Sequence, residues 1–326
     1  MKWPVIDLHC DLLSYLEISE KRSAFDRVVH CSIPQLKEGN VKLQVMAVFT
    51  QTGQNSIESA QKQIDIYKKL DQNYAGDFQP YQLKTCPQIQ TLLAIENASG
   101  LWDEQDSFSL GLKRLHSLFQ SNYRPLYIGM TWHTENRFGG GNSSKVGLKE
   151  DGKRLLEELN QQNIAIDLSH TSDALADGIL DYIEYKNLTI PILASHSNAR
   201  EICPHPRNLP DTLAKEIIKR KGVIGLNFYK NFIGQHENDM IRHVEHWLEL
   251  GGEHAISLGA DFFYEGDLSS IAMTKLQPYF SEFDSAACYQ KLLNKMQKMI
   301  GLSENQLLAF ASLNAEKFIT QCLQKK

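Results

Sequence analysis

Residues 164–197, IAIDLSHTSDALADGILDYIEYKNLTIPILASHS, contain two short apolar runs separated by one helical pattern. The runs at 164–168 and 190–194 are continuous rather than alternating, as expected of parallel strands that are covered on both faces. Between them, Leu175, Ile179 and Ile183 recur at helical spacing. The stretch therefore predicts a strand–helix–strand unit of an α/β protein.

The same alternation extends along the chain in both directions. Helical patterns are predicted from about Lys153 to Gln162 and after Pro210-Asp211, and residues 56–74 are expected to form one surface helix. Eight apolar runs are predicted to be strands: 5–9, 43–49, 91–95, 126–131, 164–168, 190–194, 223–227 and 255–259. Eight such units favour closure into a (β/α)8 TIM barrel, and a doubly wound open sheet is the alternative.

No linker, repeat or low-complexity tract divides the chain of 326 residues. Barrels often exceed 250 residues as one unit. Residues 1–326 are therefore predicted to form a single (β/α)8 domain. Its helical segment from about 266 to 326 is expected to pack on the outside or the bottom of the barrel.

Composition and charge exclude several classes of partner. The net charge is -5 and no long run of Lys or Arg occurs, so nucleic acids and anionic membranes are poor partners. No stretch of about 18 apolar residues predicts a membrane span. The six cysteines are scattered without a CxxC pair and are expected to be reduced thiols, which favours a cytoplasmic location.

Polar side chains gather where the predicted strands end, which is the face that carries catalytic sites in barrels. The first strand ends in His9-Cys10-Asp11. Side chains two apart on a strand point the same way, so His9 and Asp11 are expected to share one centre and Cys10 to be structural. Other predicted strand ends supply Glu96, His133, His170, His196 and Asp261.

Histidine nitrogens combined with carboxylate oxygens suit Zn²⁺ or a similar divalent ion. Five such ligands are too many for one tetrahedral catalytic zinc that keeps an open position. They fit two metal ions, with Glu96 as the bridge, His9 and Asp11 on one ion, and His170 and His196 on the other.

Seven blocks of sequence stand in order along the chain: 6–11 (IDLHCD), 32–39 (SIPQLKEG), 166–170 (IDLSH), 195–197 (SHS), 203–211 (CPHPRNLPD), 227–229 (NFY) and 259–262 (GADF). Together they resemble the membrane (renal) dipeptidase family of zinc metallopeptidases, peptidase family M19. Each block is modest on its own, but their order and spacing are specific.

The resemblance implies an amidohydrolase-like zinc dipeptidase whose five ligands hold two zinc ions, with a bridging hydroxide that attacks the peptide bond of a dipeptide. It implies further that Asp261 shuttles the proton and that His133 stabilises the tetrahedral intermediate. Arg207 would bind the terminal carboxylate of the substrate, which a planar guanidinium matches with two parallel hydrogen bonds. The family also suggests a homodimer.

Three positions depart from the family pattern. Leu8 stands where Gly is usual, Cys10 where Asn is usual, and Phe263 where a second acidic residue commonly follows the catalytic aspartate. The metal set survives these changes, so they bear on substrate preference. Tyr229 follows a predicted strand and either lines the substrate site or is structural.

Some alternatives stay open at this point. An amidohydrolase-type enzyme with two metals could act on another small amide, lactone or ester, and a metal-binding protein could lack catalysis altogether. Asp7 is either a supporting partner of the metal ligands or a plain strand carboxylate. His243 and His246, three apart on a predicted helix, are expected to lie on a solvated face.

Overall fold

Eight parallel strands close into a ring in the protein, a computed structural model that describes residues 2–53, 55–82, 86–120, 123–267 and 277–324. Closure comes from β2, which pairs with β1 on one side and with β4 on the other. The barrel strands are β1 (Val5–Cys10), β2 (Val41–Val48), β4 (Ile89–Ile95), β5 (Tyr127–Gly129), β6 (Ala165–Asp167), β7 (Ile192–Ala194), β8 (Val223–Leu226) and β9 (Ile256–Leu258). All eight predicted strands and the (β/α)8 barrel are confirmed, and the open sheet is excluded.

A further strand, β3 (Phe78–Pro80), was not predicted. It lies outside the ring and pairs with the first residues of β4, from Ile89 to Thr91. Three residues that end in proline carry neither an alternating nor a continuous apolar pattern, so the sequence offers no signal for this strand.

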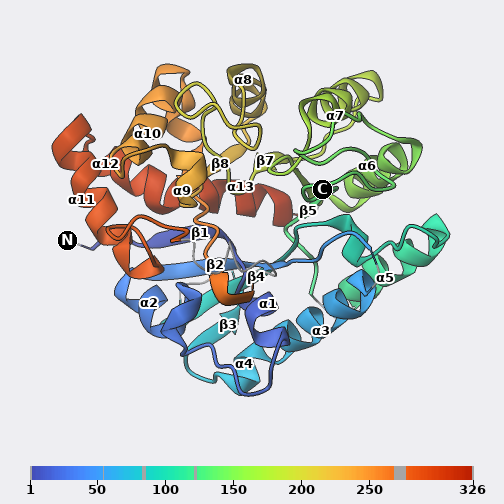
Figure 1. Ribbon diagram of the computed structural model, residues 1–326, viewed down its shortest axis with the longest axis horizontal. Coiled ribbons are helices and arrows are strands. Elements are labelled where there is room, and N and C mark those ends of the chain that lie inside the picture. The colour runs from blue at the N-terminus through green and yellow to red at the C-terminus, as the bar shows by residue number, and fades with distance from the viewer. Residues whose placement is uncertain (1, 54, 83–85, 121–122, 268–276, 325–326) are drawn as a thin grey trace.

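Helices surround the ring, with α6, α7, α8 and α10 on one side and α2 to α5 on the other (Figure 1). Their bounds are α1 (Leu12–Glu17), α2 (Ile33–Glu38), α3 (Ser56–Lys68), α4 (Leu70–Asn73), α5 (Phe108–Gln120), α6 (Glu150–Gln162), α7 (Asp173–Tyr185), α8 (Asp211–Lys219), α9 (Lys230–Ile233), α10 (Asp239–Glu249), α11 (Tyr289–Ile300), α12 (Glu304–Leu308) and α13 (Asn314–Leu323). The single helix predicted over 56–74 is wrong in one respect. It breaks at Lys69 (φ -106°, ψ 0°) into α3 and α4.

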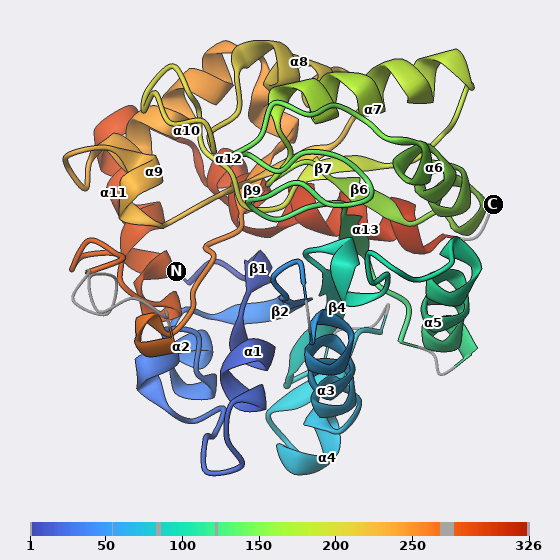
Figure 2. The ribbon, with the colours of Figure 1, turned by 45° about the vertical axis from the view of Figure 1, so that its right-hand side comes forward.

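The C-terminal helix α13 crosses the middle of the molecule in both ribbon views (Figures 1 and 2). Phe318 and Ile319 of this helix are buried in one cluster with Ile6, Leu43 and Val223, which stand near the starts of their strands. The helix thus packs against the N-terminal end of the barrel. That the whole segment from about 266 to 326 packs on the barrel stays a prediction, and residues 268–276, 325 and 326 lie outside the described residues. That the whole chain is a single domain stays a prediction.

Two further expectations concern the whole chain. All six cysteines are free thiols, as the sequence predicted. Within the described ranges, no helix is both long enough and apolar enough to cross a membrane.

Candidate metal centre and substrate site

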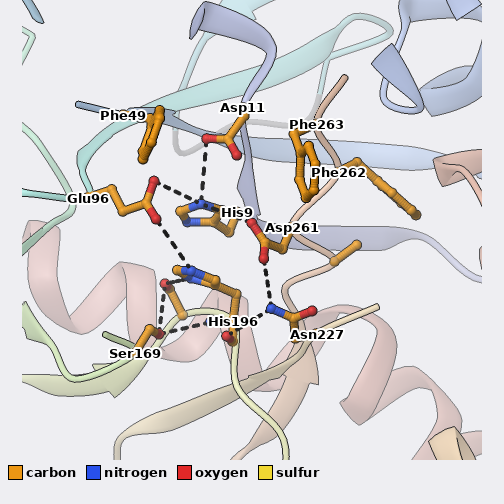
Figure 3. A network of polar contacts seen from close by, with 12 residues as sticks. His9, Asp11, Phe49, Glu96, Ser169, His196, Asn227, Asp261, Phe262 and Phe263 are labelled. Carbon is orange, nitrogen blue, oxygen red and sulfur yellow. Dashed lines mark hydrogen bonds and ion pairs between the residues drawn. The ribbon is translucent and has the colours of Figure 1, made fainter. Parts of the chain in front are cut away.

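Six acidic and histidine side chains meet at the C-terminal ends of the barrel strands, and Figure 3 labels all of them except His170. His9 lies in β1, and the others follow β1, β4, β6, β7 and β9 within three residues: Asp11, Glu96, His170, His196 and Asp261. In each of three overlapping groups of these residues, the potential ligand atoms lie within 4.8 Å of one another. The structure therefore brings together all five predicted metal ligands and Asp261.

The first half of the cluster is centred on His9. Its Nε2 atom lies 3.8 Å from Oδ1 of Asp11, 3.6 Å from Oε2 of Glu96 and 3.7 Å from Oδ1 of Asp261. Zinc bonds of about 2.1 Å at tetrahedral angles separate two ligand atoms by about 3.4 Å. The spacing suits one shared cation.

The second half uses the other oxygen of Glu96. Its Oε1 lies 2.9 Å from Nε2 of His170 and 3.7 Å from Nε2 of His196, and the two Nε2 atoms are 3.0 Å apart. Glu96 therefore offers one oxygen to each half. This geometry fits a bridging role for Glu96, which stays a prediction.

Asp261 connects the cluster to β8 through Asn227, whose Nδ2 donates to Oδ2 of Asp261 at 2.8 Å. Its backbone has φ +62°, in the left-handed region that few residues other than glycine adopt. Such strain persists only where the surrounding structure imposes it, often at functional sites. Asp261 was predicted as a proton shuttle, and its geometry also makes it a candidate ligand.

The hydrogen bond made by one nitrogen of a histidine ring determines which nitrogen faces the cluster. Tyr127 of β5 donates its hydroxyl proton to the carbonyl of Leu8 at 3.0 Å, so it accepts from Nδ1 of His9 at 2.8 Å. The Nε2 atom of His9 is then left with a free lone pair, which is the form of histidine that binds metals.

His196 has a longer support of the same kind. The Ser195 hydroxyl donates to Oδ2 of Asp167 at 2.5 Å and accepts from Nδ1 of His196 at 2.6 Å. Asp167 also accepts from the backbone N–H of Ser169 and of Ser195. This chain of Asp167, Ser195 and His196 joins the ends of β6 and β7 and directs Nε2 of His196 into the cluster.

Asn142 supports the remaining two rings. Its Oδ1 accepts from Nδ1 of His133 at 3.0 Å and lies 3.4 Å from Nδ1 of His170. The preceding Gly141 runs against the backbone of Trp132, where a Cβ would come within 2.0 Å of the carbonyl oxygen. The glycine is therefore needed to bring Asn142 to the two histidines.

Burial disfavours the charged forms of several acidic and histidine side chains in the cluster. Burial raises the pKa of Glu96 to about 8 and of Asp261 to about 6, and it raises the pKa of Asp11 well above its ordinary value. Burial also lowers the pKa of His170 and His196 far below the usual range. Divalent cations reverse this preference, because they favour ionised carboxylates and neutral imidazoles.

Three atoms of the cluster are buried without a hydrogen-bond partner among the described residues: His9 Nε2, Asp11 Oδ1 and Glu96 Oε2. Buried polar atoms are rarely left unpaired, because each costs about 1–3 kcal/mol. Since all three face one another, they would be satisfied together by one cation. The residues present therefore fit a divalent metal site.

Arg207 lies buried beside this cluster. Its Nη1 donates to Oγ of Ser197 at 2.9 Å and its Nη2 donates to the carbonyl of His196 at 2.8 Å. Its Nε has no partner, and within the described residues no carboxylate forms an ion pair with the guanidinium. Burial lowers the pKa of Arg207 to about 10, so the group stays a cation at neutral pH.

Other predicted positions have mixed outcomes. Asp7 accepts from the backbone N–H of His9 and of Ala260 and from the hydroxyl of Tyr289, so it ties β1 to its neighbours instead of contacting the His9 ring. The register of β1 against β2 shifts between Asp7 and Cys10, which explains why Asp7 and His9 diverge. Cys10 is fully buried, as expected of a structural residue.

The prediction of a solvated face for His243 is wrong. The ring is fully buried, accepts from the backbone N–H of Ala199 at 3.1 Å and donates to the carbonyl of Ile233 at 2.8 Å. His246 is partly buried and pairs with Asp211 at 2.7 Å. Helix α10 is amphipathic, and His243 falls on the same inward face as Met240 and Trp247.

Comparison with known proteins identifies the family that the sequence matches. Residues 1–325 match the sequence model of the membrane dipeptidases, peptidase family M19. An uncharacterized protein from the pqqA 5′ region of Klebsiella pneumoniae is 32% identical over 151 residues, which cover 41% of this chain and 54% of that protein. The chain thus spans about half the length of this curated relative.

Solved structures share the fold over nearly the whole chain. A metallopeptidase from Rhodobacter sphaeroides, liganded with a phosphinate mimic of the dipeptide L-Ala-D-Ala, has a TM-score of 0.82 at 20% identity, covering 99% of this chain and 100% of that one. The dipeptidase AC, a metallopeptidase of family M19, has a TM-score of 0.80 at 20% identity, covering 99% of each chain.

The barrel and its cluster of buried potential ligands have the arrangement of a metal site at the C-terminal ends of the strands. Because the family model matches almost every residue, the chain belongs to the membrane dipeptidase family, peptidase family M19.

Proposed function

We propose that the protein is a zinc dipeptidase that hydrolyses the peptide bond of free dipeptides with two bound Zn²⁺ ions. His9, Asp11 and Glu96 would hold one ion, and Glu96, His170 and His196 the other. Imidazole nitrogens and carboxylate oxygens around small sites with an open position are typical ligands of catalytic zinc.

The observation that carries the substrate class is the buried guanidinium of Arg207. Asp261, Asp167 and Glu96 act on the guanidinium only at longer range, and its Nε has no partner among the described residues, so an anion bound there would compensate the buried charge. The free α-carboxylate of a dipeptide supplies this anion, with the planar geometry that a guanidinium matches. Because Arg207 donates to the carbonyl of His196, the carboxylate would lie next to the metal cluster.

When bound, the two ions would lower the pKa of the attacking water and polarise the peptide carbonyl. Asp261, whose carboxylate lies 3.7 Å from Nε2 of His9 and accepts from Asn227, would take the proton of the water and return it to the leaving amine. His133 would hydrogen-bond the carbonyl oxygen as negative charge develops.

Because Oδ1 of Asn142 faces Nδ1 of both His133 and His170, both Nδ1 atoms would carry protons. His133 would then donate from Nε2 as the doubly protonated imidazolium. Tyr229, half-buried after β8, would contact the substrate.

Two further proposals concern the setting of the enzyme. The six free thiols support a cytoplasmic location, where cysteines stay reduced. A homodimer stays a prediction from the family resemblance.

The function is tested with zinc-reconstituted protein and four substrates: L-Ala-L-Ala, L-Ala-D-Ala, the amide of L-Ala-L-Ala, and an uncharged lactone. We expect cleavage of at least one free dipeptide and little cleavage of the amide or the lactone, because both lack the carboxylate. Turnover of the lactone without turnover of any dipeptide would establish the alternative, an amidohydrolase acting on another small substrate.

A further inference from the structure

Aromatic side chains extend from Arg207 along one wall of the site. The Arg207 guanidinium carbon lies 5.6 Å from the ring centre of Phe232, which lies 4.8 Å from that of Tyr229. The Tyr229 ring is in turn 5.9 Å from the ring of Phe263. We name Phe232, Tyr229 and Phe263 the aromatic arc. All three rings are half-buried, so part of each ring is accessible.

The far end of the aromatic arc lies beside the metal cluster. Phe263 and Phe49 lie on opposite sides of Asp11 in Figure 3. Phe263 follows Asp261 by two residues in the loop after β9. Its backbone N–H donates to the Tyr279 hydroxyl at 3.0 Å, which donates to the Asp261 carbonyl at 2.9 Å. The loop that carries the Phe263 ring is thus fixed at two points.

The acidic groups that follow Phe263 in this loop are already paired. Glu265 lies 3.1 Å from Nε2 of His30, and Asp267 accepts both terminal nitrogens of Arg22 at 2.6 Å. Over residues 262–267, this wall therefore presents an apolar ring and no free carboxylate to a substrate.

The metal cluster sets which part of a dipeptide meets Phe263. In the proposed function the scissile carbonyl would lie at the metal ions, so a carboxylate at Arg207 places the C-terminal residue between Arg207 and the ions. The amino-terminal residue then lies on the far side of the scissile carbonyl, beside the cluster, where Figure 3 shows Phe263 next to Asp11 and Asp261.

We infer that Phe263 is a specificity-determining residue that selects dipeptides with a large apolar side chain at the amino-terminal position. This inference rests on the proposed dipeptidase activity. A half-accessible ring gains free energy when a ligand methyl or methylene group covers it. One additional methylene in an apolar subsite changes selectivity by about 10- to 200-fold.

The test compares kcat/KM for Leu-Ala, Ala-Leu and Ala-Ala in the zinc-loaded enzyme and in Phe263→Ala and Phe263→Leu. The ratio of the kcat/KM values of two substrates in one preparation does not depend on the fraction of active protein. We expect Leu-Ala to exceed Ala-Ala by about 10-fold or more in the parent enzyme. We expect Phe263→Ala to reduce this ratio several-fold, Phe263→Leu to keep most of it, and the Ala-Leu to Ala-Ala ratio to change little in either variant.

Phe25→Ala is the matched control, because Phe25 is a half-exposed ring that packs on Tyr74 outside the site. It should leave all ratios unchanged. Suppose that Ala-Ala is cleaved, but the ratio of kcat/KM for Leu-Ala to kcat/KM for Ala-Ala is near one in the parent enzyme, or does not change in Phe263→Ala. In either case the inference is wrong and the dipeptidase proposal stands. If no dipeptide is cleaved, both are wrong.

Discussion

Glu96 and His170 form the closest carboxylate–imidazole contact of the cluster, with Oε1 of Glu96 at 2.9 Å from Nε2 of His170, while the other oxygen of the same carboxylate faces His9 at 3.6 Å. One side chain therefore reaches both halves of the site. A residue in this position is expected to determine how many ions the protein holds.

Glu96→Gln should reduce metal content from about two ions per chain to about one, because the amide keeps one oxygen but loses the second ligand atom. Inductively coupled plasma mass spectrometry after equilibration with zinc measures the content. Glu158→Gln is the matched control: Glu158 is a buried carboxylate that pairs with His116 at 2.7 Å, away from the cluster. Two ions retained in Glu96→Gln would contradict the bridging role.

Ser195→Ala should weaken zinc binding by about 10- to 100-fold, because the variant loses the hydroxyl that links His196 to Asp167. Competition with a chromophoric chelator measures the affinity without any catalytic readout. Ser257→Ala removes a buried hydroxyl that has no hydrogen-bond partner among the described residues, so it should leave the affinity unchanged. Equal affinities in both variants would show that the Ser195 link does not support the metal site.

Arg207→Ala should lower kcat/KM for L-Ala-L-Ala by about 100-fold, mainly through KM, since it removes the partner of the substrate carboxylate. The weak turnover of the dipeptide amide should change little. Arg200→Ala is a suitable control, because Arg200 stands in the neighbouring loop but pairs with Asp173 at 2.7 Å. An equal loss on the free dipeptide and on its amide would instead indicate that Arg207 has a structural role.

His243 predicts a pH dependence of stability. Burial lowers its pKa to about 4, below the value of about 6.5 in an unfolded chain. The unfolded state therefore binds the proton first as pH falls, so this contribution to stability is intact above pH 6.5 and is lost progressively toward pH 4. At pH 5 the loss should be about 2 kcal/mol.

Urea unfolding of the metal-free protein at pH 7 and pH 5 measures this loss. His243→Asn offers an oxygen to the Ala199 N–H and carries no titrating group, so its stability should fall by less over the same interval. A parent protein and a variant with equal pH dependence would be inconsistent with a neutral buried His243.

The barrel was predictable because its signals are local. Each buried strand is a continuous apolar run, and Leu175, Ile179 and Ile183, which recur at helical spacing, form the buried face of α7. Strand β3 was missed because three residues ending in Pro80 pair only at the edge of β4. Strand β6 (Ala165–Asp167) is as short as β3 but could be predicted, because the residues that flank it in the sequence are apolar.

The polar groups of the site were predictable as residue types at strand ends, but their supports were not. Tyr127 looks like an ordinary strand aromatic, and only the closed barrel brings its hydroxyl to His9. Asp167 lies within a recognised block, yet its link to Ser195 depends on the pairing of β6 with β7. The divergence of Asp7 from His9 follows from a register shift that alternation along a regular strand does not anticipate.

The central claim is that five of the clustered side chains hold two catalytic cations: His9, Asp11, Glu96, His170 and His196. It is tested most directly by measuring zinc content and L-Ala-L-Ala hydrolysis on the same samples, before chelation, after chelation and after zinc is restored. We predict about two ions per chain, activity that disappears as they are removed, and recovery of both together. A folded protein that binds no divalent ion, or one that cleaves dipeptides equally well without metal, would contradict the account.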